Sequence, residues 1–205
     1  MATAIVVRRG NFRRRKLVQA GFSLLEVVIS MAILTVGMVS LLGVFGLAMA
    51  STQTSQQDMI AKQLANEADE SVVTARNTAQ MNWDQINNVN STFCSPGVSS
   101  CGIFLKNFQP MYFAGADGIF GTIDDAAAGE EYLTDPGVDG LYNTADDVQI
   151  PLTNYQRQIV IGPLYDSSNN LITSLRSVTI TVLYSTAQGQ TQRTYTVNSF
   201  ISQFQ

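Results

Sequence analysis

Uncharged and mostly apolar residues run without a break from Val27 to Ala50, a stretch of 24 residues. Because about 20 apolar residues in a helix cover the hydrocarbon core of a bilayer, this stretch predicts a membrane-spanning helix. Beyond it, apolar residues recur at spacings of three and four, which is the pattern of one helix face. They are Ile60, Leu64, Ala68, Val72, Ala75 and Ala79. We therefore expect one helix from about 22 to 80, apolar all round in its first half and amphipathic in its second.

Alternation of apolar and polar residues follows in the last third of the chain and predicts β-strands. Residues 177–184 and 191–201 alternate, and the sequence AQGQ between them predicts a hairpin turn. A third strand is expected at 155–164, followed by the turn sequence DSSNN at 166–170. Within 177–184, one face carries Val178, Ile180, Val182 and Tyr184 and the other carries Thr179, Thr181 and Leu183. Strands that follow a helix indicate an α+β fold, with a small antiparallel sheet on the apolar stripe of the helix.

The charges are distributed unevenly along the chain. Six of the twelve basic residues precede residue 21, and all sixteen acids follow it. The six are Arg8, Arg9, Arg13, Arg14, Arg15 and Lys16. Without them the remainder carries 6 − 16 = −10, which repels nucleic acid, so no nucleic-acid binding is expected. Basic residues that flank an apolar span hold the N-terminus in the cytoplasm, which leaves the acidic part outside it.

The sequence contains no histidine, which excludes Ser-His-Asp and Cys-His catalysis and most zinc sites. A membrane-anchored hydrolase with a carboxylate pair is the remaining enzyme class. The acids are concentrated in Gly-rich turns rather than in the flanking pairs that a glycosidase needs. We expect no enzymatic activity.

The two cysteines lie in residues 87–113, where the pattern predicts a mixed loop with one short strand. Cys94 and Cys101 enclose the sequence SPGVSS, and its Pro-Gly turn can bring the two sulfurs within bonding reach. A disulfide is expected if this region lies outside the cytoplasm. Two free thiols are the alternative, and a metal pair lacks the further Cys or His ligands that would complete it.

A single carboxylate, Glu26, stands at the start of the apolar span. A charge costs about 2.5–3.5 kcal/mol at the centre of a bilayer and less near its interface, so Glu26 needs a partner. The surrounding sequence KLVQAGFSLLEVVISMAIL resembles the N-terminus of class III signal-peptide proteins, which are type IV prepilins and the pseudopilins of type II secretion. The residues that match the family pattern in order are Gly21, Phe22, Ser23, Leu24, Leu25 and Glu26.

The resemblance implies a processing step and an assembly step. A membrane peptidase of that family cuts after the glycine and methylates the new N-terminus, here the α-amine of Phe22. The carboxylate of Glu26 would then meet the amine of a neighbouring subunit, because two opposite charges attract strongly at low dielectric. The alternative is a single-pass membrane protein with an incidental interfacial glutamate.

The resemblance also implies the domain organisation and location. Residues 1–21 would be a basic leader, 22–50 the transmembrane and filament-core helix, 51–82 its amphipathic continuation, and 83–205 an extracytoplasmic β-sheet head of the pilin fold. The protein would cross the inner membrane once, with a cytoplasmic N-terminus, before it enters a surface pilus or a periplasmic pseudopilus. Its expected partners are the prepilin peptidase, other pilin or pseudopilin subunits, the inner-membrane assembly platform and, before assembly, membrane lipid.

An acidic insert at 115–147 contains two copies of G-x-D-G-(aliphatic)-(aromatic)-x-T-x-D-D, offset by 22 residues. The repeats, 115–125 and 137–147, resemble Asp/Gly-rich calcium loops of extracytoplasmic bacterial proteins, and Ca²⁺ takes six to eight oxygen ligands. The expected ligands are Asp117, Asp124 and Asp125 in the first repeat and Asp139, Asp146 and Asp147 in the second. No cofactor is required, and Ca²⁺ is the candidate ion. Two solvated turns, pinned to the domain by Phe120 and Tyr142, are the alternative.

The leading functional hypothesis is a minor pilin of the prepilin-modification type, a structural and assembly subunit of a pilus-like filament. The span VVISMAILTVGMVSLLG resembles the anchor of such proteins and also that of minor type II secretion pseudopilins, which is the alternative. A calcium-dependent adhesive or binding module displayed on the filament is the third hypothesis.

Overall fold

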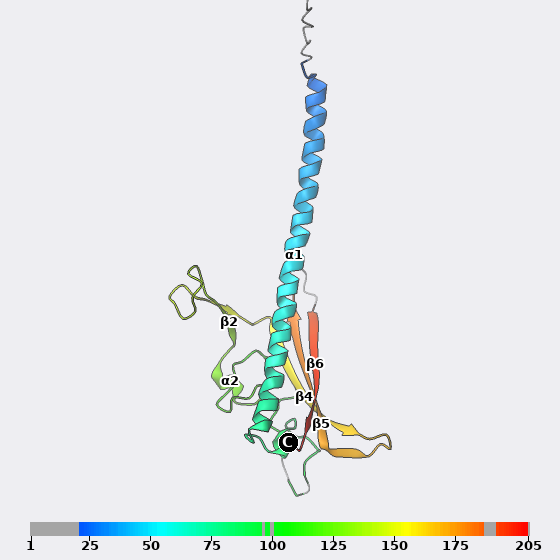
Figure 1. Ribbon diagram of the computed structural model, residues 1–205, viewed down its shortest axis with the longest axis vertical. Coiled ribbons are helices and arrows are strands. Elements are labelled where there is room, and N and C mark those ends of the chain that lie inside the picture. Colours follow the sequence, from blue (N-terminus) through cyan, green and yellow to red (C-terminus); the bar gives the residue numbers. More distant parts are fainter. Residues whose placement is uncertain (1–20, 96, 99–100, 187–191, 205) are drawn as a thin grey trace, which may run out of the picture. The chain divides into compact units, whose positions relative to one another are not determined.

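The computed structural model describes residues 21–95, 97, 98, 101–186 and 192–204 and has the predicted α+β architecture (Figure 1). A long N-terminal helix is followed by antiparallel strands. The elements are α1 (Leu24–Asn77), the 3₁₀ helix η1 (Trp83–Gln85), β1 (Gln109–Pro110), α2 (Asp125–Ala128), β2 (Tyr132–Asp135), β3 (Val148–Pro151), β4 (Tyr155–Tyr165), β5 (Leu171–Ser185) and β6 (Gln192–Ser202). The chain divides after Leu47 into two compact units, and the second, which begins at Ala48, is called the head below.

The part of α1 that belongs to the head buries one stripe of small and aliphatic side chains. Its buried residues are Ala61, Leu64, Ala65, Ala68, Val72 and Ala75. The predicted stripe is therefore largely confirmed, although Ile60 is only half-buried. The prediction is wrong for Ala79, which lies beyond the last residue of α1 and is exposed. Its φ is +58°, which is not helical. The N–H of Gln80 bonds to the carbonyl of Ala75 at 2.9 Å, which closes the helix with a left-handed residue.

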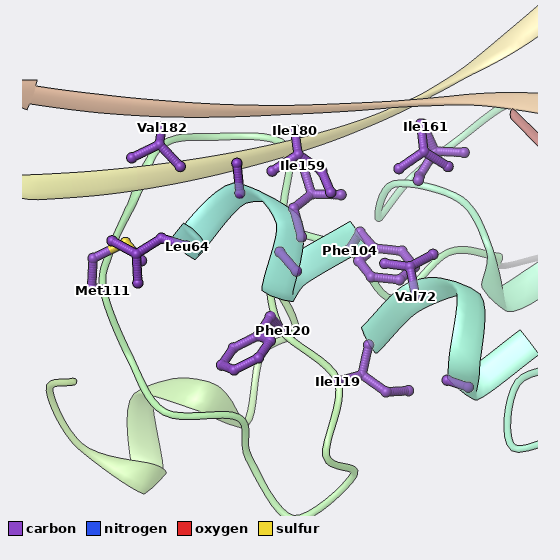
Figure 2. Close-up of a cluster of buried hydrophobic side chains, with 14 of the residues drawn as sticks. Leu64, Val72, Phe104, Met111, Ile119, Phe120, Ile159, Ile161, Ile180 and Val182 are labelled. Carbon is purple, nitrogen blue, oxygen red and sulfur yellow. The ribbon is translucent and has the colours of Figure 1, made fainter. Parts of the chain in front are cut away.

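The main sheet has the antiparallel order β1-β4-β5-β6. The three strands predicted from alternation are β4, β5 and β6, and the inward face of β5 carries the four residues expected there. Ile159 of β4 pairs with Ile180 of β5, and both pack with Leu64 and Val72 of α1 (Figure 2). The turn at 166–170 is confirmed, whereas the AQGQ sequence lies outside the described residues.

The disulfide between Cys94 and Cys101 is present, as predicted, with 5.7 Å between the two Cα atoms. The segment before it is tied to β5 by Arg176, whose guanidinium donates to the carbonyls of Trp83 and Ile86 and lies 4.1 Å from the Trp83 ring centroid. Such cation–π stacking and the hydrogen bonds to carbonyls compensate for the burial of this charge.

A second, two-stranded sheet formed by β2 and β3 was not predicted by the sequence. Its strands flank the second repeat, and all four β3 residues are exposed. Residues 130–151, called the arm below, form a ribbon with a loop at its tip (Figure 1). The base of the arm is packed on the head, where Glu131 is buried and Leu133 contacts the core. An isolated two-stranded hairpin is only marginally stable in water, so the structure of the arm depends on additional contacts.

Candidate functional site

The N-terminal candidate site is built around the first turn of α1. The N–H of Glu26 donates to the carbonyl and to the hydroxyl oxygen of Ser23, at 3.0 and 3.2 Å, so Ser23 caps the helix. A carboxylate in the first turn of a helix is also favoured by the helix dipole. The Phe22 side chain is exposed, and no described residue of the chain bonds to the carboxylate of Glu26. The structure thus leaves this charge available to a group outside the described residues.

The following part of α1 exposes apolar side chains on every face. From Gly21 to Met49 every residue is exposed, including the aliphatic residues of the uncharged span. By length and composition this is a helix that can cross a membrane. A surface of this kind requires lipid or other apolar helices around it, because water is an unfavourable solvent for it.

Residues 16–42 match the family model of the prokaryotic N-terminal methylation motif. No curated protein and no solved structure matches the chain. The motif covers the end of the basic segment, Gly21, Glu26 and the first part of α1. Together with the α+β fold, this match supports the type IV pilin and pseudopilin family. The family is one of membrane-anchored precursors that a prepilin peptidase processes and that assemble with other pilins.

The second candidate site is the pair of Asp/Gly repeats, which fold with the same hydrogen bonds. In each repeat the two final carboxylates accept N–H groups from the start and the middle of the same loop. The threonine hydroxyl donates to the first of those carboxylates. Near the start of the loop, the N–H of Asp117 donates to Asp124 at 3.2 Å, and the N–H of Asp139 donates to Asp146 at 3.3 Å. In the middle of the loop, the N–H of Gly121 donates to Asp125 at 2.6 Å, and the N–H of Asn143 donates to Asp147 at 2.7 Å. The hydroxyl of Thr122 donates to Asp124 at 2.6 Å, and that of Thr144 donates to Asp146 at 2.8 Å.

The repeats also share two left-handed backbone positions, although Gly137 has φ of +67° and its equivalent Gly115 is not left-handed. Gly118 and Gly140 have φ of +69° and +68°. Gly121 and Asn143 have φ of +86° and +66°, and both residue types adopt this left-handed region more readily than others. The 22-residue repeat in the sequence is therefore a repeat in the structure.

The repeats differ in what surrounds them. Ile119 and Phe120 of the first repeat are 2% and 8% exposed and belong to the core of the head (Figure 2). Leu141 and Tyr142, the equivalent residues of the second, are 62% and 64% exposed. The expectation that an aromatic residue pins each loop to the domain is correct for Phe120 and wrong for Tyr142, because the second repeat lies at the tip of the arm.

The first repeat can present carboxylate oxygens to one cation. Asp117, Asp124 and Asp125 each have an oxygen within 4.8 Å of the others. The hydrogen bond from Thr122 lowers the pKa of Asp124, whereas burial raises the pKa of Asp125. These three groups are hard oxygen ligands of the type that Ca²⁺ prefers, and carbonyls or water would have to complete its coordination.

A buried group of charges lies beside this repeat and was missed by the sequence analysis. Arg157 is 4% exposed, its guanidinium lies 4.2 Å from the Phe120 ring centroid, and its Nη2 donates to the carbonyl of Tyr112. Burial raises the pKa of Glu131 to about 7, against the opposing effect of Arg157. Among the described residues, Nη1 of Arg157 and Oε2 of Glu131 are buried without a hydrogen-bond partner.

The signal for Arg157 was present in the alternation of β4. Tyr155, Arg157, Ile159 and Ile161 are all buried and stand on the same face of the strand. A lone arginine at an inward position predicts a buried cation that must be compensated. The identity of its neighbours could not be read in the same way, because they come from distant segments.

Proposed function

We propose that the chain is a minor pilin, cleaved after Gly21, methylated on the amine of Phe22 and assembled into a pilus-like filament. The observation that supports this proposal best is the carboxylate of Glu26. It lies at the start of the exposed apolar half of α1, has no partner among the described residues, and stands in register with the glycine of the methylation motif. The amine of a neighbouring subunit would neutralise it once both charges leave water.

The physical driving force has two parts. Apolar side chains of the first half of α1 would pack against the same helix of other subunits when they leave the lipid, and the charge pair would fix the axial register. An uncompensated buried charge is strongly unfavourable, so insertion of a subunit out of register would be disfavoured. A minor pseudopilin of a type II secretion system uses the same steps, and labelling of surface filaments distinguishes the two.

The direct test is the N-terminal sequence of the mature protein from cells with and without the prepilin peptidase. We expect methylated Phe22 at the N-terminus in the first case and the uncleaved leader in the second. An intact leader in cells with an active peptidase contradicts the proposal.

A second candidate function, calcium binding, is supported by the carboxylates of the first repeat. Asp117, Asp124 and Asp125 converge within 4.8 Å, in a loop whose backbone is fixed by left-handed glycines and hydrogen bonds. The equivalent acids of the second repeat form the same hydrogen bonds in a more exposed loop. Ca²⁺ bound in this way would stabilise the head, and the arm could then act as a calcium-dependent binding module on the filament.

A further inference from the structure

The tip of the arm exposes a group of apolar side chains next to carboxylates. Val138 is fully exposed, and Leu141 and Tyr142 are exposed by more than half. Val148 and Ile150 of β3 are also exposed. Contiguous exposed apolar side chains mark interaction sites more often than scattered ones do, and Leu141 and Tyr142 are adjacent in the sequence.

The first repeat shows what kind of surface receives such a loop. With equivalent hydrogen bonds to its two final carboxylates and two shared left-handed positions, it inserts Ile119 and Phe120 into the head. The receiving surface is apolar, and it also contains the guanidinium of Arg157, 4.2 Å from the Phe120 ring centroid. The second repeat presents Leu141 and Tyr142 on the same loop, so it is shaped for a surface of the same chemistry.

The charge of the arm indicates that the partner's surface is positively charged. The arm contains six acids and no basic residue. They are Glu130, Glu131, Asp135, Asp139, Asp146 and Asp147, of which only Glu131 is buried. An acidic loop with an apolar centre is complementary to an apolar pocket with a basic rim, and like charges around the pocket would oppose docking.

Charge disfavours a second copy of this chain as the partner, although each copy has an apolar cavity lined by Trp83, Phe93 and Arg176. In each copy the pocket beside Arg157 is already filled by the first repeat, with Arg157 stacked on Phe120. Arg176 is buried, and Arg193 forms an ion pair with Asp58 at 2.9 Å. After residue 21 the chain carries 6 − 16 = −10, so two copies repel each other over long distances.

We propose that the second repeat is a docking element for a different protein. Leu141 and Tyr142 insert into an apolar pocket of that partner, an arginine of the partner stacks on the Tyr142 ring, and basic residues at the rim face the carboxylates of the arm. The arm belongs to the head and not to the first half of α1, so this proposal does not depend on filament assembly.

The test is photo-crosslinking with the full-length chain in the cells that make it. The photoreactive residue p-benzoylphenylalanine replaces Val138, and the adduct is analysed by mass spectrometry of the linked peptides. We expect an adduct with one other polypeptide, linked at a segment that contains arginine. Tyr142→Ala and Leu141→Ala should each lower its yield at least about tenfold, and high salt should lower it as well. Ile123→Ala is the matched control, because Ile123 is an exposed aliphatic residue of the first repeat and should leave the yield unchanged.

Other outcomes overturn the proposal. An adduct only with a second copy, with lipid or with polysaccharide shows a different partner class. An adduct whose yield is unaffected by Tyr142→Ala shows that the second repeat is not the docking element, and the absence of any adduct shows that the arm is not in contact with a partner. Because the Tyr142 side chain is exposed, its variant should keep the melting temperature of the wild type, which separates lost docking from lost folding.

Discussion

The side chain of Asn88 accepts a hydrogen bond from the backbone N–H of Ile161 at 2.8 Å, although 73 residues separate the two. The same amide donates to the carbonyl of Ile159, also at 2.8 Å. Since β1 pairs with β4 only at Gln156 and Arg157, Asn88 satisfies the edge of β4 where no strand continues. A single buried side chain therefore substitutes for part of a missing strand.

Replacement of Asn88 by leucine should destabilise the head. The N–H of Ile161 and the carbonyl of Ile159 would be buried without partners, which costs roughly 2–5 kcal/mol and lowers the melting temperature by roughly 5–15 °C. Thermal unfolding of the full-length protein in detergent measures the effect. Asn66→Ala, on the exposed side of α1, is the control and should change the stability by less than about 0.5 kcal/mol. An equal effect of both variants would remove the assigned role of Asn88.

Glu131 should make the stability of the head depend on pH. Its pKa is raised from 4.5 to about 7 by burial, so the folded protein binds this proton more tightly than the unfolded chain does. Ionisation of Glu131 is therefore less favourable in the folded protein than in the unfolded chain. As a result, the free energy of unfolding falls as the pH rises from 4.5 to about 7 and does not fall further, through this group, above the folded pKa.

Replacement of Glu131 by glutamine imitates the protonated form. The variant should be more stable than the wild type above pH 7 by about 1–3 kcal/mol, and the difference should vanish below pH 4.5. Unfolding across this pH range measures it, with the exposed neighbour Glu130→Gln as the control. A difference that stays constant with pH contradicts the assignment.

The disulfide should contribute modestly to stability, because it closes a short loop. Cys94 and Cys101 are separated by 7 positions, and for such a loop the chain-entropy model gives about 2 kcal/mol. The double variant Cys94→Ala/Cys101→Ala should lose this amount in denaturant titrations. A reductant should produce the same loss in the wild type and no further loss in the variant. A reductant effect on the variant would point to another cause.

The charge of Glu26 should be needed for assembly and not for folding. Glu26→Gln keeps the shape and removes the charge, so we expect normal membrane insertion and cleavage but at least an about tenfold lower amount of protein in sheared filaments. Glu70→Gln, exposed in the second half of α1, is the control and should assemble like the wild type. Normal incorporation of the Glu26→Gln variant into filaments would refute the pairing with a neighbouring amine.

Calcium should raise the melting temperature of the full-length protein in detergent if the first repeat binds it. Asp124→Asn should abolish the rise, because it removes one of the three converging carboxylates. The matched change Asp146→Asn tests the second repeat. If the calcium-dependent rise in melting temperature disappears only when both changes are made together, both repeats bind calcium. The absence of any shift at millimolar Ca²⁺ in the wild type excludes calcium binding by either repeat.

Much of the fold could be predicted because its signals are local. The helical and strand periods of the apolar pattern predicted α1 and the three long strands. The prediction that Val178, Ile180, Val182 and Tyr184 share one face of β5 is confirmed, because all four are buried. The helix end was harder to predict. Ala79 continues the apolar spacing, but the chain turns there through a left-handed residue, and nothing in the alanine itself indicates this.

The candidate sites divide in the same way. The register of Gly21, Phe22 and Glu26 is contiguous in the sequence, so it could be recognised without a structure. The charge group of Arg157 and Glu131 could not, because its members come from separate segments and their interaction depends on how the head packs.

The sequence by itself determined the long apolar helix, the isolated charge at its start, the short spacing of the two cysteines and the existence of two similar loops, since each depends on neighbouring residues. Only the tertiary structure decided that one of these loops is buried on Arg157 and that the other stands exposed at the tip of a ribbon. The physical reason is that burial depends on the surface that distant segments provide, and two loops with the same local conformation carry no information about which of them meets that surface.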